Sequence, residues 1–266
     1  MKRYAIPLIL ALLCCSCQTT PQSDLPSIIE QAQQSVVRLV VVAFDADKKP
    51  QSVVVGSGFV VGKGKIATAA HILTKLSKGA TLFAVPAPQE EFNLTKNVTI
   101  VYALDAKHDL ALLSCAGLAK LPSLPLGKTD EVRLGEDALV LGFPLSDPSL
   151  TATRAMVAAR SKKRILEQDT TLTDMIKLDA SINAGNSGGP IIHVPSGKVI
   201  GVVSGKEGAL SKHLQVFRKK KSGVSMMIGE DDPIKLIKGT LTDMERNLQL
   251  GLGYGVSVKY LKAMLK

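Results

Sequence analysis

The sequence predicts an all-β protein built from two six-stranded antiparallel β-barrels. Three observations carry this prediction: short β-branched runs, the Gly, Pro, Asp and Lys clusters that separate them, and the lack of helical segments alternating with them. A parallel α/β sheet needs a helix between successive strands, so the pattern favours antiparallel pairing. The chain has 266 residues, of which 45% are hydrophobic. This is enough to build a core and excludes intrinsic disorder.

The expected strands fall into two groups of six on either side of a proline-containing linker. They lie at 36–42, 52–61, 65–68, 81–85, 98–102 and 110–114, and then at 138–142, 154–158, 175–178, 190–194, 199–204 and 254–258. Residues 120–128 contain Pro122 and Pro125 and divide the groups. We therefore expect one barrel over about 36–119 and a second over about 129–258.

Helical patterning is confined to three places. Ser27 and Glu30 form a capping-box pattern ahead of a short helix that is expected to run through about Gln34. Further helices are expected over 232–247 and from Val258 to Leu265. The predicted fold is therefore all-β with a short N-terminal helix, a C-terminal helix and a partly helical insertion.

The N-terminus has the pattern of an export signal. Lys2 and Arg3 precede an apolar run, Tyr4–Cys15, which is too short to span a bilayer as a mature helix. Ser16-Cys17 resembles the end of a bacterial lipoprotein signal, in which a small residue precedes the cysteine that is lipidated. We expect a signal peptide over 1–16, lipidation at Cys17 and a tether over 17–27, which predicts a lipid-anchored, periplasm-facing protein. Simple secretion is the alternative.

Composition argues against several function classes. Only Cys115 lies outside the signal region, so the body has no disulfide framework and no CxxC zinc site; neither a metal nor a cofactor is expected. There is no Trp, and aromatic residues make up 4% of the chain, which does not support stacking on nucleic acid. The net charge of +10 is concentrated at 160–164 and 218–221. We interpret these runs as solvated surface, with attraction to anionic lipid or an acidic substrate as the alternative.

Three short segments carry candidate chemistry, and they follow one another in the order His, Asp, Ser: 66–71, 108–113 and 184–190. A serine hydroxyl needs a base to become a nucleophile, and a tetrahedral oxyanion needs preorganised donors. Glycines on both sides of Ser187 let the backbone turn sharply and bring N–H groups, most naturally those of Gly185 and Ser187, close to a substrate carbonyl. A glycine-rich hairpin with an incidental serine is the alternative.

Two other hydrolase folds fit poorly. The run around Ser187 also matches G-x-S-x-G, but the α/β-hydrolase order requires an acid and then a histidine after the serine. Glu207 is the only acid between Ser187 and His213, and it lies too close to that histidine for two separate loops. The subtilisin order would use Asp45 or Asp47 and needs alternating helices, which the sequence lacks.

Thr68–His71, Asp109–Leu113 and Gly185–Pro190 resemble the three triad segments of trypsin-like serine proteases, and the chain is most similar to the bacterial HtrA/DegP type. Gly56–Val61 and Gly253–Val256 add to this resemblance, which covers about residues 28–266 and implies the chymotrypsin-like two-barrel fold. It implies that His71 is the general base and then acid, that Asp109 fixes its tautomer, and that Ser187 is the nucleophile.

The resemblance also implies where substrate binds. Ser181, six residues before the nucleophile, would lie at the base of the primary pocket, and 201–206 would form its wall and pair with the substrate backbone through Ser204, Gly205 and Lys206. An uncharged floor favours small or medium apolar residues over Lys or Arg. His108 is expected to face solvent, because it neighbours Asp109 on a strand. His193 and His213 are expected to be structural or exposed.

The chain departs from the HtrA pattern in two ways. It is expected to lack the C-terminal peptide-binding PDZ domain, and it carries an insertion over about 207–251 where HtrA-like proteases have a short loop. The predicted function is an exported, membrane-anchored serine endopeptidase that cleaves protein or peptide substrates through an acyl-enzyme. The alternative is a catalytically silent lipoprotein of this fold that binds proteins. The resemblance to HtrA-like proteins is compatible with assembly into an oligomer.

Overall fold

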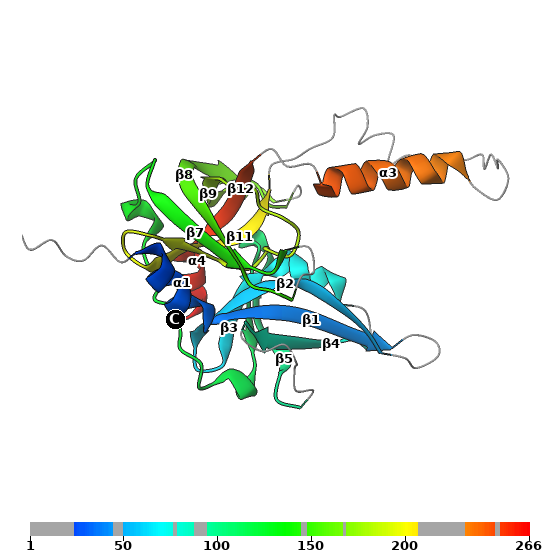
Figure 1. The fold of residues 1–266 in the computed structure, drawn as a ribbon, viewed down its shortest axis with the longest axis horizontal. Helices are drawn as coiled ribbons and strands as arrows, with labels where there is room; N and C mark the ends of the chain where they lie inside the picture. The colour runs from blue at the N-terminus through cyan, green and yellow to red at the C-terminus, as the bar shows by residue number, and fades with distance from the viewer. Residues whose placement is uncertain are drawn as a thin grey trace, which may run out of the picture.

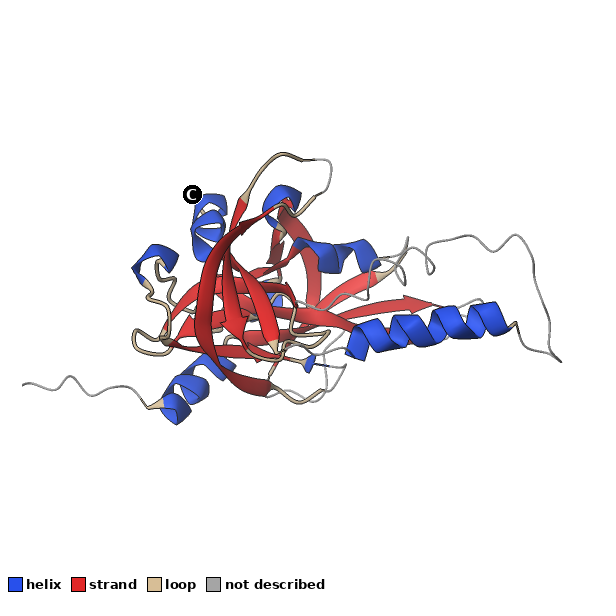
Figure 2. Cartoon of the chain, turned by 90° about the horizontal axis from the view of Figure 1, so that it is seen from above, coloured by secondary structure: helices blue, strands red, loops and turns tan. Residues whose placement is uncertain are grey.

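The two-barrel prediction is confirmed by the structure. The computed structural model describes residues 24–44, 50–76, 79–87, 95–144, 148–166, 169–206, 232–247 and 251–266. Within these residues, twelve strands close into two antiparallel barrels, with strand orders β1-β2-β3-β6-β5-β4 and β10-β11-β12-β9-β8-β7 (Figure 1). Figure 2 shows the strands at the centre and the helices around them.

The first barrel is formed by β1 (Val36–Phe44), β2 (Pro50–Gly62), β3 (Lys65–Ala69), β4 (Thr81–Pro86), β5 (Val98–Asp105) and β6 (Leu110–Ser114). Its core follows the two-residue period of a strand, because Val37, Leu39 and Val41 of β1 point to the same side and pack together. Ile66 and Leu113 join the same cluster. The β-branched runs of the sequence therefore form the inside of this barrel.

The second barrel is formed by β7 (Asp137–Gly142), β8 (Thr151–Lys163), β9 (Thr173–Asp179), β10 (Pro190–His193), β11 (Lys198–Lys206) and β12 (Leu252–Ser257). β8 is longer than expected from the sequence. Residues 160–163, part of a basic run, continue to pair with β9 while their side chains remain exposed. Backbone pairing extends this strand where side-chain hydrophobicity has already ended.

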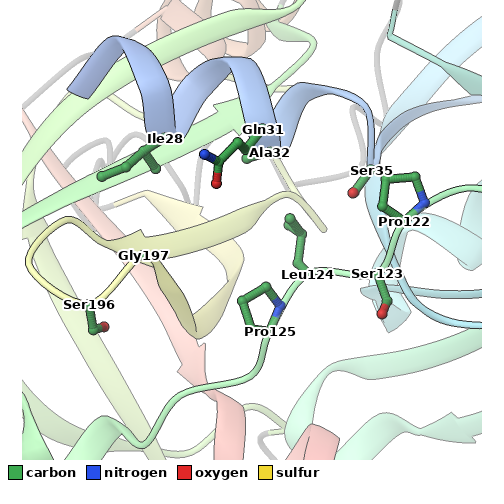
Figure 3. Close-up of a pocket in the computed structure, with 10 residues that line it drawn as sticks. All are labelled: Ile28, Gln31, Ala32, Ser35, Pro122, Ser123, Leu124, Pro125, Ser196 and Gly197. Carbon is green, nitrogen blue, oxygen red and sulfur yellow. The ribbon is translucent and has the colours of Figure 1, made fainter. Parts of the chain in front are cut away.

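A shared apolar cluster joins the two barrels. Phe59 and Leu112 of the first barrel lie in one cluster with Leu141 and Val202 of the second. Helices α1 (Leu25–Gln33) and α4 (Val258–Met264) add side chains to the same cluster, namely Ile28, Ala32, Val258 and Leu261. The linker is also part of this region: a cavity of about 440 Å³ lies between α1 and Leu124 and the two linker prolines (Figure 3).

Helix α1 begins earlier than predicted. The expected N-cap, Ser27, lies within the first turn, the N-cap position is occupied by Asp24, and residues 25–27 of the expected tether are helical. Pro26 explains the difference, because proline is tolerated in a first turn, where N–H groups have no intrahelical partner. Helix α3 (Pro233–Asn247) agrees with its expected range, and the Asp232 carboxylate accepts N–H bonds from Ile234 and Lys235 at its start.

Several predictions fall outside the described residues. These are the signal region with Cys17, the basic run 218–221, and His213. Of the expected insertion, only residues 232–247 and Gly251 are described. Within the described parts of the chain, none of the helices is long and apolar enough to cross a membrane.

Hydrogen bonds to the Glu136 carboxylate stabilise the turn before β7. Its carboxylate accepts hydrogen bonds from the backbone N–H and the Nε of Arg133, both at 2.8 Å, and lies 3.0 Å from His193 Nε2. The Arg133 backbone N–H and then its guanidinium lower the pKa of Glu136 from 4.5 to about 2. His193 also contacts the Ser196 hydroxyl at 2.9 Å, which confirms its structural role.

The Glu136 carboxylate should therefore make stability pH-dependent. Its folded-state pKa lies below the unfolded value, so its contribution is present above pH 4.5 and is lost as the pH falls toward 2. We predict that the difference in unfolding free energy between the wild type and Glu136→Gln is largest near neutral pH and shrinks across this window. Urea titrations at several pH values measure it. A difference that stays constant with pH contradicts the prediction, and Glu30→Gln, on the exposed surface of α1, is the control.

Candidate active site

His71 stands where β3 leaves the first barrel. Thr68 and Ala69 at the end of β3 are fully buried, and the chain then enters a short 3₁₀ helix, Ala70–Lys75. Ile72, also fully buried, anchors this turn, while the His71 side chain remains 40% exposed. The local sequence therefore places an imidazole on a rigid edge of the barrel with its ring open to solvent.

Asp109 occupies an unusual backbone position at the start of β6. Its φ is +52°, and it is the only non-glycine residue with positive φ among those described. Aspartate tolerates this left-handed region better than most residues do. The turn before it is fixed by Asp105, whose carboxylate accepts the His108 N–H at 3.2 Å, and by the Asp109 carbonyl, which accepts the Ala70 N–H at 3.1 Å. The carboxyl group is thus directed toward the turn that carries His71.

The His71 and Asp109 side chains form a close pair. Nδ1 lies 2.9 Å and 3.1 Å from the two carboxylate oxygens, and the His71 backbone N–H donates to Oδ1 at 2.8 Å. Asp109 is 5% exposed, so this contact is largely shielded from water. In the neutral ring, a proton on Nδ1 that is donated to Asp109 leaves the Nε2 lone pair free to accept another proton.

Ser204 has a contact that sequence reasoning missed. We expected it in the wall of a pocket, but its hydroxyl donates to Asp109 Oδ2 at 2.5 Å. The cause is a β-bulge: the register between β11 and β12 shifts between Val203 and Gly205, which leaves Ser204 outside the ladder. A bulge redirects the side chain of the extra residue. No sequence signal marks this position, because the bulge depends on how β12 pairs.

Ser187 lies in the loop before β10, against the first barrel. The Ser57 N–H donates to the Ser187 carbonyl at 2.8 Å. Gly188 has φ +84°, and a Cβ there would lie 2.1 Å from the Ser57 carbonyl oxygen and 2.2 Å from Thr68 Oγ1. Only glycine permits so close an approach. Because Thr68 is three residues before His71, this packing brings the Ser187 loop to the edge that carries the histidine.

The loop also presents unused donors. Among the described residues, the N–H groups of Gly185 and Ser187 donate to no acceptor, and the Ser187 hydroxyl makes no hydrogen bond to the His71 ring. Gly185 has φ +101°, a conformation that side-chain-bearing residues rarely adopt. An oxyanion hole requires N–H groups that no other acceptor occupies, and these two amides meet that condition among the described residues. Nucleophile–base contacts are often long in the absence of substrate.

Ser57 is a residue of this region whose role the sequence analysis did not identify. Its buried hydroxyl donates to the Gly185 carbonyl at 2.7 Å and accepts the Phe143 N–H at 3.0 Å. Its carbonyl accepts from Thr68 Oγ1 at 2.7 Å. Ser57 belongs to β2, whereas Gly185 and Phe143 belong to the second barrel. One side chain therefore connects both barrels to the Ser187 loop.

The prediction that His108 faces solvent is wrong. Its Nδ1 lies 2.6 Å from Asp105 Oδ2, and its ring stacks on Tyr260 of α4 with centroids 3.8 Å apart. The expected strand geometry does not apply, because His108 ends a 3₁₀ turn, Ala106–His108, that α4 covers. The turn before Asp109 is also bonded to the second barrel, since Thr173 Oγ1 donates to the Lys107 carbonyl at 3.2 Å.

The expected pocket residues lie on one side of the second barrel. Ser181 is exposed in the segment after β9, and Ile182 next to it packs so closely on Gly253 that a Cβ there would lie 2.1 Å away. Gly253 pairs with Lys206, and Gly205 pairs with Tyr254. The Ser181 segment therefore lies beside β12, next to the strand that ends in Gly205 and Lys206. No cluster suited to a metal ion occurs among the described residues.

Comparison with known proteins identifies the family of the chain. Residues 56–202 match the family described as "Trypsin-like peptidase domain". The match spans more than half of the sequence, and the chain therefore belongs to the trypsin-like peptidase family.

Within this family the chain is similar to HtrA-type proteins. It is 30% identical over 162 residues to "Probable periplasmic serine endoprotease DegP-like" of Rickettsia conorii, covering 59% of this chain and 30% of that protein. It is 31% identical over 210 residues to "Serine protease HTRA2, mitochondrial" of Bos taurus, covering 74% and 42%. The chain thus spans less than half of the length of these relatives. The solved structure "HtrA-type protease AlgW with decapeptide" shares the fold, with a TM-score of 0.62 at 20% identity, covering 90% of this chain and 65% of that one.

The Ser57 contacts predict a measurable cost for losing this hydroxyl. Ser57→Ala leaves the Phe143 N–H and the Gly185 carbonyl without their shared partner, and a buried unpaired polar group costs about 1–3 kcal/mol. We expect the free energy of unfolding to fall by about 2 kcal/mol in urea titrations. Ser161→Ala on the exposed part of β8 is the control, with an expected change within about 0.5 kcal/mol. Equal stability of the two variants would refute the role of Ser57.

Proposed function

We propose that this chain is a serine endopeptidase that hydrolyses peptide bonds through an acyl-enzyme. The observation that carries the proposal is the close pairing of His71 Nδ1 with the shielded Asp109 carboxylate, at the edge against which the Ser187 loop packs. That pairing prepares the other ring nitrogen as a base. The trypsin-like family and the serine protease names of the relatives support the same reaction.

In the proposed reaction, Ser187 Oγ attacks the carbonyl carbon of the scissile bond while His71 Nε2 takes the hydroxyl proton. The negative charge that develops on the carbonyl oxygen is met by the N–H groups of Gly185 and Ser187. Asp109 stays ionised and stabilises the imidazolium, which then donates its proton to the leaving amine. Water, deprotonated by His71, hydrolyses the acyl-enzyme and restores the Ser187 hydroxyl.

The contact from Ser204 fits this mechanism. Its hydroxyl and the two donors of His71 leave the Asp109 carboxylate with three hydrogen bonds. These three hydrogen bonds hold the carboxylate in one orientation beside the ring that takes the proton. Ser204 therefore acts as a positioning residue in the proposed site, in addition to its place in the strand that would pair with substrate.

Substrates are proposed to be proteins or peptides. Peptides accompany the similar solved structures, as their descriptions state. Ser181 would form an uncharged floor for the primary pocket and Gly205 and Lys206 its wall, which suits small or medium apolar side chains at the cleaved position. Residues 28–266 would form the protease unit, with 207–251 inserted between its last two strands.

We further propose that the protein is exported to the cell envelope and held there by a lipid on Cys17. The basic and apolar pattern of 1–16 supports export, and one similar protein is described as periplasmic. Stable anchoring requires more than one acyl chain, which lipoprotein-type modification of an N-terminal cysteine supplies. Residues 17–24 would then separate the membrane from α1.

The nucleophile is tested by covalent labelling. We expect a fluorophosphonate probe to label the wild type and not Ser187→Ala, and peptide cleavage to fall at least about a thousandfold in that variant. Ser161→Ala serves as the matched control and should label normally. If the folded wild type resists the probe and cleaves no peptide in a diverse library, the endopeptidase proposal fails and a silent binding protein of this fold is favoured.

The anchor is tested by mass spectrometry of the N-terminal peptide from protein expressed in a bacterial host. The wild type should carry an acyl mass shift on a peptide that begins at Cys17 and should fractionate with membranes. Cys17→Ser should lose both properties, whereas Cys115→Ser should keep them. Persistence of the mass shift in Cys17→Ser would disprove lipidation at this residue.

A further inference from the structure

A pocket beside the His71–Asp109 pair is lined by cations that the proposed reaction does not use. It has a volume of about 540 Å³ and lies between the end of β5 and the chain that leaves β8. Lys163 and Arg164 line it from the second barrel, and Leu104 and Ala106 line it from the first. We call this the cationic pocket. It shares His71, Asp109 and Ser204 with the candidate active site.

Among the described residues, the positive charges that line the cationic pocket outnumber the negative ones. Among the described residues that line it, Asp109 is the only acidic one, and its oxygens are already engaged by His71 and Ser204. Lys163 is exposed and lies 5.0 Å from the centre of the Tyr254 ring, and neither it nor Arg164 forms an ion pair with a described residue. A ligand group entering this pocket therefore meets two positive charges that no described carboxylate neutralises.

Apart from the residues named above and Thr74, the described lining is apolar. Leu73, Ile165 and Leu166 surround the pocket, and Leu104 and Leu166 are 58% and 43% exposed. Large apolar side chains left open around a pocket favour contact with a ligand. A short aliphatic stem that ends in a carboxylate satisfies both parts of this lining, because the stem packs on the leucines while the charge lies against Lys163 and Arg164.

From these observations we infer that Lys163 and Arg164 select substrates with an acidic side chain shortly before the scissile bond. The inference rests on the proposed function, since it concerns the same site. Ser204 belongs to the strand that would pair with the substrate backbone, so side chains of that segment reach the pocket. This segment precedes the bond, because the residue in the primary pocket supplies the carbonyl that Ser187 attacks.

The first test compares cleavage of matched peptides. For each of the second, third and fourth positions before the cut, three peptides carry Glu, Gln or Lys at that position, and all other residues are kept constant. We expect kcat/KM to favour Glu over Lys by about tenfold at one of these positions. The double variant Lys163→Ala, Arg164→Ala should lose most of this preference. The double variant Lys163→Glu, Arg164→Glu should prefer the Lys peptide over the Glu peptide. High salt should weaken the preference of the wild type, because exposed charges are screened.

Lys162→Ala is the matched control. It removes one positive charge from the residue next to Lys163 on β8, but Lys162 lies 3.9 Å from Asp174 and does not line the cationic pocket. The Lys162→Ala variant should favour Glu over Lys peptides in kcat/KM by the same factor as the wild type. Equal kcat/KM for Glu and Lys peptides at all three positions, or an equal effect of Lys162→Ala and the double variant, would overturn the inference.

A binding measurement separates this inference from the proposed chemistry. Fluorescently labelled forms of the same peptides are titrated with Ser187→Ala, which retains Lys163 and Arg164, and binding is measured by polarisation. Tighter binding of the Glu peptide supports the cationic pocket even if the wild type cleaves nothing, in which case only the endopeptidase proposal fails. If the wild type cleaves but the Glu, Gln and Lys peptides bind equally at every position, only the selection of acidic substrates is refuted.

Discussion

The buried hydroxyl of Ser57 is the contact on which the candidate site depends. It accepts the Phe143 N–H and donates to the Gly185 carbonyl, so a residue of the first barrel satisfies two backbone groups of the second. The same residue holds the Ser187 carbonyl through its own N–H. Buried polar groups need such partners, because each one left unpaired costs more than a single hydrogen bond gains. The Ser187 loop is thereby placed by barrel docking as well as by its own glycines.

The unfavourable backbone conformation of Asp109 is offset by contacts from the residues around it. A left-handed conformation costs a non-glycine residue about 1 kcal/mol or more. Contacts from several elements hold the turn: Asp105 caps it, Tyr260 stacks on His108, and Thr173 bonds to the Lys107 carbonyl. Because these groups come from both barrels and α4, the carboxylate is oriented before any substrate binds. In the proposed reaction, such preorganisation would suit Asp109 to stabilise the transient charge on His71.

The fold was predictable because the strands of both barrels have local sequence signals, namely short β-branched runs. Each observed strand overlaps a β-branched run, and the order of His71, Asp109 and Ser187 pointed to one site that the described contacts of the first two support. The missed features depend on partners distant in sequence. Ser204 turns to Asp109 only because β11 bulges against β12, and His108 leaves solvent only because α4 covers it. In both cases the partner element, β12 or α4, lies far along the sequence from Ser204 or His108.

The candidate site is divided between the two barrels, so the barrels must act as one unit in the proposed enzyme. The base and its carboxylate belong to the first barrel, whereas the nucleophile, its amide donors and the Ser204 hydroxyl belong to the second. A small shift between the barrels would therefore alter the nucleophile–base distance and the Ser204–Asp109 bond together. A peptide lying across the cationic pocket would contact both barrels, since Leu104 of the first barrel and Lys163 of the second both line it. A ligand that binds only the docked arrangement stabilises it, so substrate binding and correct alignment of the site would reinforce each other.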